Sequence, residues 1–98
     1  IDAYVSGFGY GIVRDLVGHG IGRKLHEAPE IPNFAQRRKG IKLCAGMTLA
    51  IEPMINMGRA DVCWMDDDWT VVTEDDSLSA HYENTILITD GEPEILTI

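Results

Sequence analysis

Three side chains in this sequence, His19, Glu52 and Glu83, are of the types that can bind a divalent cation together. One imidazole and two carboxylates suit Mn²⁺, Fe²⁺, Co²⁺ or Zn²⁺ better than Ca²⁺ or an ion that prefers thiolates. Cys44 and Cys63 do not have the close spacing of a structural zinc site. A metal site in this chain would therefore be built from histidine and carboxylate ligands.

Glycines surround the first of these residues, because Gly18, Gly20 and Gly22 alternate around His19. Each glycine disfavours a helix by about 0.5–1 kcal/mol relative to alanine, so we expect a loop in which backbone or a ligand can approach closely. His26 follows seven residues after His19 and can hydrogen-bond a substrate rather than a metal. The spacing differs from the G-x-G-x-x-G fingerprint of dinucleotide binding. On this stretch alone, a ligand-binding loop and two ordinary, partly buried histidines remain equally open.

The composition describes a small acidic chain, in which 98 residues carry a formal net charge of −8. This charge disfavours a nucleic-acid or anionic-membrane surface, and no apolar run approaches the ~20 residues of a membrane span. We expect Cys44 and Cys63 to be reduced core thiols, as in a cytosolic protein, with a disulfide between them left open. The chain begins at Ile1 in a stretch typical of the end of a helix, and we expect a piece of a longer polypeptide.

Short elements between glycines and prolines are predicted to position the histidines. Residues 1–6 predict the last turns of a helix, and the β-branched residues 11–17 predict a strand that leads into the His19 loop. Residues 29–33 contain two prolines and predict an extended, irregular passage.

Glu52 is predicted to lie at the end of a strand over residues 47–52. The strand ends at Pro53, which cannot donate a hydrogen bond to a ladder. With a period of two, Glu52 shares a face with Thr48 and Ala50. Burial of a lone charge among such small neighbours is costly, so we expect a positive group to meet this carboxylate.

Residues 79–89 predict the longest strand, and alternation places His81 and Glu83 on the same face. A further strand is predicted at residues 69–73. An Asp-Gly pair then predicts a hairpin turn before a returning strand at residues 94–98.

Five stretches of the chain together resemble the type I methionine aminopeptidases. They occur in the same order and at compatible spacings, and they cover nearly the whole chain. They are Gly18-His19-Gly20-Ile21-Gly22, His26-Glu27-Ala28-Pro29, Gly46-Met47-Thr48-Leu49-Ala50-Ile51-Glu52-Pro53-Met54, Trp69-Thr70-Val71 and Ser79-Ala80-His81-Tyr82-Glu83-Asn84-Thr85-Ile86.

The resemblance implies the pita-bread α/β (α+β) fold, in which two related halves surround a dinuclear metal centre. Residues 1–98 would be the C-terminal half of the catalytic domain, with a mainly antiparallel curved sheet and a helix. The family's two aspartate ligands and another substrate-contacting histidine come from the N-terminal half, which is absent from this chain. We therefore expect the chain alone to be inactive.

The activity implied is that of a cytoplasmic, metal-dependent aminopeptidase that removes the initiator methionine from nascent proteins with a metal-activated water. The cofactors would be two divalent ions of Co²⁺, Mn²⁺, Fe²⁺ or Zn²⁺. The expected partners are a peptide N-terminus beginning with methionine, the missing N-terminal half and the ribosome, with no membrane and no direct nucleic-acid site.

Residue by residue, the resemblance implies that His19 and Glu52 ligate one metal and that Glu83 bridges both. Glu52 is also our candidate for the group that takes the proton of the water. His26 would contact the scissile peptide and help to stabilise the tetrahedral intermediate.

The same resemblance places Trp69 and Met54 near the pocket for the substrate methionine. We slightly favour a core role for Trp69 instead. His81 stands where many relatives carry glutamine, which bears on the shape of the substrate pocket.

Two alternatives have different functions on the same fold. Prolidases and Xaa-Pro aminopeptidases share a similar first histidine motif but usually place the last glutamate in an Arg-x-Glu-like context. The sequences around Glu52 and Glu83 favour the methionine enzyme. The other alternative is an inactive pita-bread module used for binding, which usually lacks the ligands that this chain has.

Overall fold

The computed structural model describes residues 1–98 as one short helix and ten short strands. The elements are α1 (Asp2–Ser6), β1 (Gly11–Ile12), β2 (Gly18–Ile21), β3 (Glu27–Ile31), β4 (Thr48–Ile51), β5 (Met54–Asn56), β6 (Val62–Trp64), β7 (Val71–Thr73), β8 (Ser79–His81), β9 (Asn84–Leu87) and β10 (Glu94–Ile95). None of them is a helix whose length and apolar character would let it cross a lipid bilayer.

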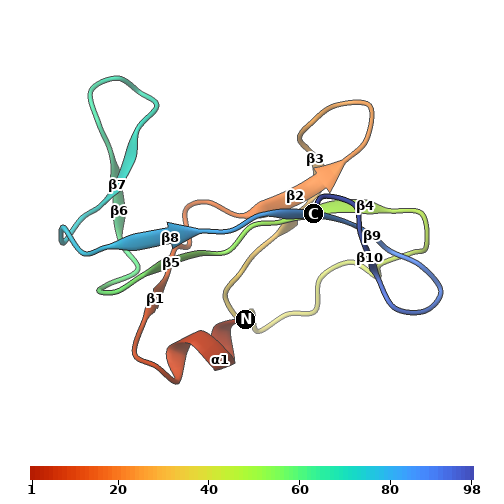
Figure 1. Ribbon diagram of the computed structural model, residues 1–98, viewed down its shortest axis with the longest axis horizontal. Coiled ribbons are helices and arrows are strands. Elements are labelled where there is room, and N and C mark those ends of the chain that lie inside the picture. Colours follow the sequence, from red (N-terminus) through yellow and green to blue (C-terminus); the bar gives the residue numbers. More distant parts are fainter.

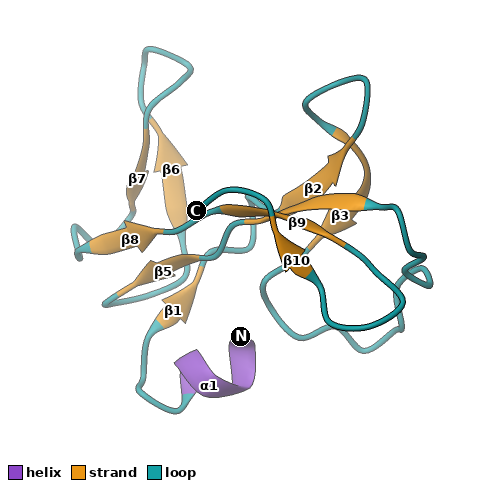
Figure 2. Ribbon diagram, turned by 45° about the vertical axis from the view of Figure 1, so that its right-hand side comes forward, coloured by secondary structure: helices purple, strands orange, loops and turns teal.

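The strands form three sheets, in which all paired strands are antiparallel. One sheet has the order β10-β9-β4-β2-β3, a second has the order β1-β5-β8, and β6 pairs only with β7. The β2–β3 and β6–β7 hairpins project in the same direction, and α1 lies on the opposite side (Figure 1, Figure 2). The prediction of a mainly antiparallel architecture with a helix is confirmed.

The short helix α1 is stabilised by its own side chains at both ends. Asp2 lies in the first turn, where a negative charge complements the helix dipole, and it accepts a hydrogen bond of 2.7 Å from the hydroxyl of Ser6. Gly7 follows the last turn, and Gly9, with a φ of 79°, turns the chain towards β1. The predicted end of a helix over residues 1–6 is confirmed.

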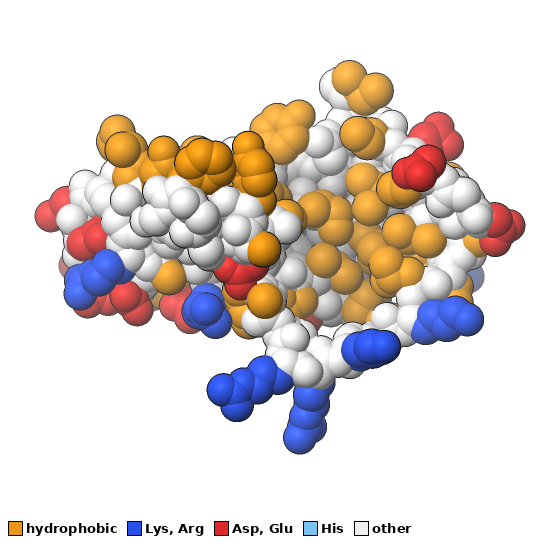
Figure 3. All heavy atoms as spheres, turned by 90° about the horizontal axis from the view of Figure 1, so that it is seen from below, with side chains coloured by type: hydrophobic (Ala, Val, Ile, Leu, Met, Phe, Trp, Pro, Cys, Tyr) orange, Lys and Arg blue, Asp and Glu red, His pale blue; other side chains and the backbone are white.

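The core lies around β4, which is the middle strand of the five-stranded sheet. Leu49 and Ala50 of this strand are almost fully buried. Only 10 of the 98 residues are buried, so many large apolar side chains remain on the surface. Figure 3 shows apolar side chains gathered in a hollow on one face, with lysine and arginine side chains projecting along its edge.

The structure corrects the prediction that His19 lies on a loop. His19 lies within strand β2, and the strand predicted over residues 11–17 is reduced to the two residues of β1. The alternating glycines are explained by close strand neighbours. A Cβ atom at Gly18 would collide with the carbonyl of Ala50, and one at Gly20 would collide with the carbonyl of Ala28.

The irregular passage predicted after the histidines begins as a strand. Residues 27–31 form β3, which contains Pro29 and pairs with β2 across a bulge between His19 and Gly20. β3 is an edge strand, so the missing N–H of a proline leaves no partner strand unsatisfied. The extended conformation was predicted, but the pairing was not.

The two strands that carry the carboxylates are both interrupted, and at the same level. The predicted strand over residues 79–89 is divided into β8 and β9, and β4 is separated from β5 in the same way. The pairings of β4 with β9 and of β5 with β8 share one register. Two residues separate β4 from β5, and two separate β8 from β9. We call these four residues the ladder gap, in which Glu52 faces Glu83 and Pro53 faces Tyr82.

The C-terminal hairpin is confirmed in its pairing but not in its turn. Leu87 pairs with Glu94, so the connection is longer than a two-residue Asp-Gly turn. Thr89 shapes this connection, because its hydroxyl donates to the carbonyl of Glu92 at 2.7 Å and accepts from the amide of Gly91 at 3.0 Å.

The cysteines are free, as expected, but they are not core residues. Both Cys44 and Cys63 are exposed. Cys63 lies on β6, which pairs only with β7, so no further layer of the chain covers it.

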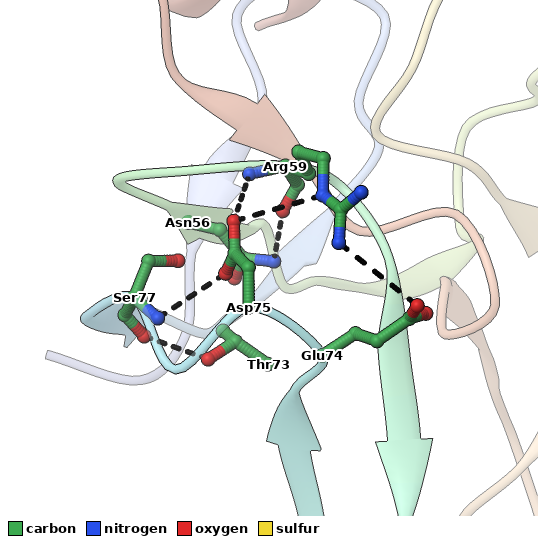
Figure 4. Close-up of polar contacts among 6 residues, drawn as sticks. All are labelled: Asn56, Arg59, Thr73, Glu74, Asp75 and Ser77. Carbon is green, nitrogen blue, oxygen red and sulfur yellow. Dashed lines mark hydrogen bonds and ion pairs between the residues drawn. The ribbon is translucent and has the colours of Figure 1, made fainter.

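Polar contacts fix the base of the β6–β7 hairpin (Figure 4). The carboxylate of Asp75 accepts the backbone N–H of Arg59 at 2.8 Å and that of Ser77 at 3.2 Å. The hydroxyl of Thr73 donates to the carbonyl of Ser77, and the amide of Asn56 donates to the carbonyl of Arg59 at 2.8 Å. The hydrogen bond from the Arg59 backbone is the largest cause that lowers the pKa of Asp75 to about 2, and the hydrogen bonding of Ser77 adds to it.

Candidate metal centre

Strand register brings the three predicted metal ligands together. Glu52 and Glu83 face each other in the ladder gap, and His19 of β2 pairs with Ala50, two residues before Glu52 on the same face. One ligand atom from each of the three side chains lies within 4.8 Å of the others. The trio therefore comes from three neighbouring segments of a single antiparallel arrangement.

The two opposed carboxylates favour a cation between them. Like charges directly opposite each other on an antiparallel pair destabilise the pair. The side chain of Glu52 is only 14% exposed, so water screens its charge weakly, whereas Glu83 is exposed. The register and the burial of Glu52 both favour the positive group expected beside this carboxylate.

The protonation of His19 is set by its hydrogen bond to the backbone. Its Nδ1 lies 2.9 Å from the carbonyl oxygen of Gly20, so Nδ1 must carry the proton. In the neutral ring, Nε2 then presents a lone pair to the Oε1 atom of Glu52 at 3.3 Å. Two acceptors at this distance need a proton or a metal ion between them, and the donor set fits a divalent metal.

His26 lies directly beside His19. The ring centroids are 4.2 Å apart with an angle of 47° between the planes, and both rings line a depression of about 400 Å³. Glu27 closes the loop that carries His26, because its carboxylate accepts the backbone N–H of Lys24 at 2.9 Å. His26 is exposed and open to a ligand from this side, and its catalytic role stays a prediction.

His81 contacts the metal-site carboxylate directly. Its Nε2 lies 3.3 Å from Oε2 of Glu52, and its side chain is about half exposed. The contact follows from the register, in which His81 pairs with Met54, two residues beyond Glu52 on the same face. The predicted substrate contact of His81 is not tested by this geometry.

Met54 and Trp69 are not brought together. Met54 is buried and lines an apolar groove of about 410 Å³ with His81. Trp69 is 86% exposed and does not line this groove. The core role favoured for Trp69 is therefore wrong within this chain, because the turn that carries it caps a hairpin with no neighbouring layer.

One residue at the site was missed by the sequence reasoning. The side-chain amide of Asn33 donates to the backbone carbonyl of Glu52 at 3.3 Å. A single asparagine between Pro32 and Phe34 has no spacing that indicates this contact.

Comparison with known proteins gives the same assignment as the geometry. The family described as metallopeptidase family M24 matches residues 1–90. The chain belongs to metallopeptidase family M24. The family is described as one of metallopeptidases, and this agrees with a histidine and carboxylate trio that can hold a metal.

Individual relatives of this M24 chain carry a more specific name. It is 61% identical over 98 residues to a methionine aminopeptidase of Clostridium perfringens, of which it covers 39%. It is 47% identical to the methionine aminopeptidase of Escherichia coli K12, of which it covers 37%. The chain therefore spans about two fifths of the length of these relatives.

Solved structures confirm the fold of the M24 chain. It superposes on a methionine aminopeptidase of Thermotoga maritima with a TM-score of 0.93 and 51% identity, over 98% of this chain and 39% of the other. For a methionine aminopeptidase of Rickettsia prowazekii the TM-score is 0.94 at 44% identity, over 99% of this chain and 40% of the other. The predicted resemblance and the pita-bread fold are both confirmed.

Proposed function

We propose that the complete protein that contains residues 1–98 is a methionine aminopeptidase, which removes the initiator methionine from nascent proteins in the cytoplasm. The observation that carries this proposal is the trio of His19, Glu52 and Glu83 at the ladder gap. The names of the similar proteins support it.

We further propose that residues 1–98 form the C-terminal half of the catalytic domain. The chain matches about two fifths of its relatives, and its apolar face is largely uncovered. Exposed apolar surface of this extent is typical of a surface that another segment covers. The occupant proposed here is the N-terminal half of the same domain.

The metal would be held by His19 and Glu52, with Glu83 shared between two ions of Mn²⁺, Fe²⁺, Co²⁺ or Zn²⁺. Divalent ions in such a site supply a nucleophilic hydroxide at neutral pH and polarise the scissile carbonyl. The hydrogen bond from His19 to Gly20 keeps Nε2 free to act as a ligand.

The remaining chemistry belongs to Glu52 of this trio and to the side chains around it. Glu52 would accept the proton of the attacking water, and the contacts of its carboxylate with His19 and His81 support this role. His26 would donate a hydrogen bond to the oxyanion that develops on the substrate carbonyl, and its position beside His19 at the open depression supports this role. Met54 and His81 share the groove on the other side of Glu52, and Trp69 would contact substrate only together with the other half.

The test is a comparison of two substrates with the complete protein loaded with Mn²⁺ or Co²⁺. We expect release of methionine from a Met-Ala-Ser peptide and little hydrolysis of an Xaa-Pro peptide. Preferential Xaa-Pro hydrolysis would assign the protein to the alternative peptidase. Metal binding without turnover of either peptide would favour a binding module.

A further inference from the structure

Asn33 is the most completely buried polar side chain near the candidate metal centre. It is 4% exposed, and its Nδ2 donates to the backbone carbonyl of Glu52 at 3.3 Å. Its Oδ1 has no hydrogen-bond partner. Burial of an amide with an unpaired oxygen costs free energy that an apolar side chain of similar size would avoid. The retained hydrogen bond to Glu52 therefore needs an explanation.

The carbonyl of Glu52 lies where the strand ladder is interrupted. Glu52 falls between β4 and β5, and the following residue, Pro53, has no N–H to offer a neighbouring strand. The amide of Asn33 supplies a donor to this carbonyl from outside the ladder. A fixed Glu52 peptide group holds the backbone from which the carboxylate side chain extends, so this bond acts on the metal site through the backbone.

The segment that carries Asn33 is itself anchored. The backbone N–H of Ala35 donates to the carboxylate of Asp2 at 2.6 Å, and the guanidinium of Arg14 lies 4.7 Å from the ring centroid of Phe34. These two contacts fix the residues directly after Asn33. Its amide is thus held against Glu52 by α1 and by the segment that follows β1.

We propose that Asn33 is a positioning residue for Glu52, which orients the carboxylate towards the metal through a hydrogen bond to the Glu52 carbonyl. This inference rests on the proposed role of Glu52 as a metal ligand. Removal of a hydrogen bond that orients a metal ligand, without itself contacting the metal, typically weakens metal affinity by about 10–100-fold.

Asn56 provides a matched control within the same chain. It is fully buried, its amide also donates to a single backbone carbonyl, that of Arg59, and its Oδ1 also lacks a partner. Its carbonyl partner belongs to the network at the base of the β6–β7 hairpin and not to the metal site. A change at Asn56 therefore reports the loss of a buried amide alone.

The experiment is calorimetric titration of Mn²⁺ into the complete protein and its Asn33→Leu, Asn33→Asp and Asn56→Leu variants, with thermal unfolding of each metal-free protein. Both changes at Asn33 remove the donor, and they differ in charge. We expect both to weaken Mn²⁺ binding by about tenfold or more, and we expect Asn56→Leu to bind as the wild type does. In the folded Asn33 variants kcat should fall with little change in KM.

Two results would overturn the inference. Wild-type Mn²⁺ affinity in either folded Asn33 variant would show that the bond does not orient Glu52. An equal loss of affinity in the Asn56→Leu variant would show a general effect of core disruption. A wild-type protein that binds none of Mn²⁺, Fe²⁺, Co²⁺ and Zn²⁺ would instead reject the proposed function itself, and with it the role of Asn33.

Discussion

At the scale of single residues, the site combines side chains that sequence spacing alone cannot connect. His19, Glu52 and Glu83 were selected by chemical type and by resemblance, and the structure adds the reason for their meeting. Glu52 faces Glu83 in the ladder gap, and His19 reaches both from the adjacent strand β2. The hydrogen bond between Nδ1 of His19 and the carbonyl of Gly20 turns Nε2 towards Glu52, where a proton or a metal ion can lie between them, and no motif could show this contact.

The first prediction concerns His26, which lies beside His19 without joining the ligand trio. In the complete protein, His26→Ala should lower kcat by roughly 10²–10³, the scale of losing one oxyanion donor, while metal content stays unchanged. Kinetics combined with metal analysis test this. The Lys24→Ala variant in the same loop is the control and should retain full activity. A loss of metal in proportion to activity would make His26 a ligand.

The second prediction concerns Glu83, which the structure places opposite Glu52. Glu83→Gln should weaken metal binding at the whole site, because a neutral amide cannot replace an anionic bridge between two ions. The measurement is metal titration of the complete protein, with Glu94→Gln on the exposed strand β10 as the control. Normal metal stoichiometry with near-normal activity would dismiss Glu83 as a surface residue.

At the scale of elements, the β6–β7 hairpin depends on the carboxylate of Asp75 at its base. The pKa of Asp75 falls from 3.8 to about 2 on folding, so its stabilising effect is complete above pH 3.8 and is lost as the pH falls towards 2. The Asp75→Asn variant should therefore have a lower Tm than the wild type at neutral pH. The difference should shrink through this acidic window and disappear near its lower end.

Thermal unfolding of the complete protein between neutral pH and pH ~2 measures this effect. Glu74→Gln is the matched control, because it removes only an exposed ion pair with Arg59 at 3.9 Å and should leave the Tm near that of the wild type. A constant difference between the Asp75→Asn variant and the wild type across the pH range would contradict the role of the ionised carboxylate.

Some of these strands could be predicted from the sequence, and others could not. Strand β4 was predicted from the alternation in residues 47–52 and the stop at Pro53, because local pattern determines such an element. The strand character of β2 was missed, because glycine lacks strand propensity and only the tight approach of Ala28 and Ala50 explains it. The interruption between β8 and β9 was also missed. It depends on a partner strand some thirty residues earlier in the chain.

For the candidate site, the chemical types of the side chains predicted the metal ligands but not the residues that hydrogen-bond to them. Asn33 escaped notice because its contact with Glu52 spans 19 residues and involves a backbone atom, which leaves no trace in the pattern of side chains. Trp69 was misplaced because large aromatic residues are usually core residues, and the exposure of its turn depends on the packing of the whole chain.

At the scale of the whole molecule, residues 1–98 are too open to hold two metal ions alone. Two divalent ions would face only two carboxylates from the trio, which leaves positive charge uncompensated and the ligand count low. We predict that the isolated 98-residue chain binds at most one metal weakly, releases no methionine and self-associates through its exposed apolar face.

Titration with Mn²⁺, peptide assays and sedimentation of the isolated chain test this prediction. Addition of the proposed N-terminal half in trans should restore metal binding and activity together. Two tight sites per isolated monomer, with turnover of Met-Ala-Ser, would show that residues 1–98 suffice.

The ladder gap has a further consequence for how the two larger sheets unfold. Both strands that connect them are interrupted at the same level, and the amide of Tyr82 bonded to the carbonyl of Pro53 at 3.2 Å bridges the interruption. An ion bound by Glu52 and Glu83 would cross-link the two strands there. Metal loading should therefore convert two sheets that open separately into one cooperative unit, and amide hydrogen exchange would slow on both sides of the gap at once.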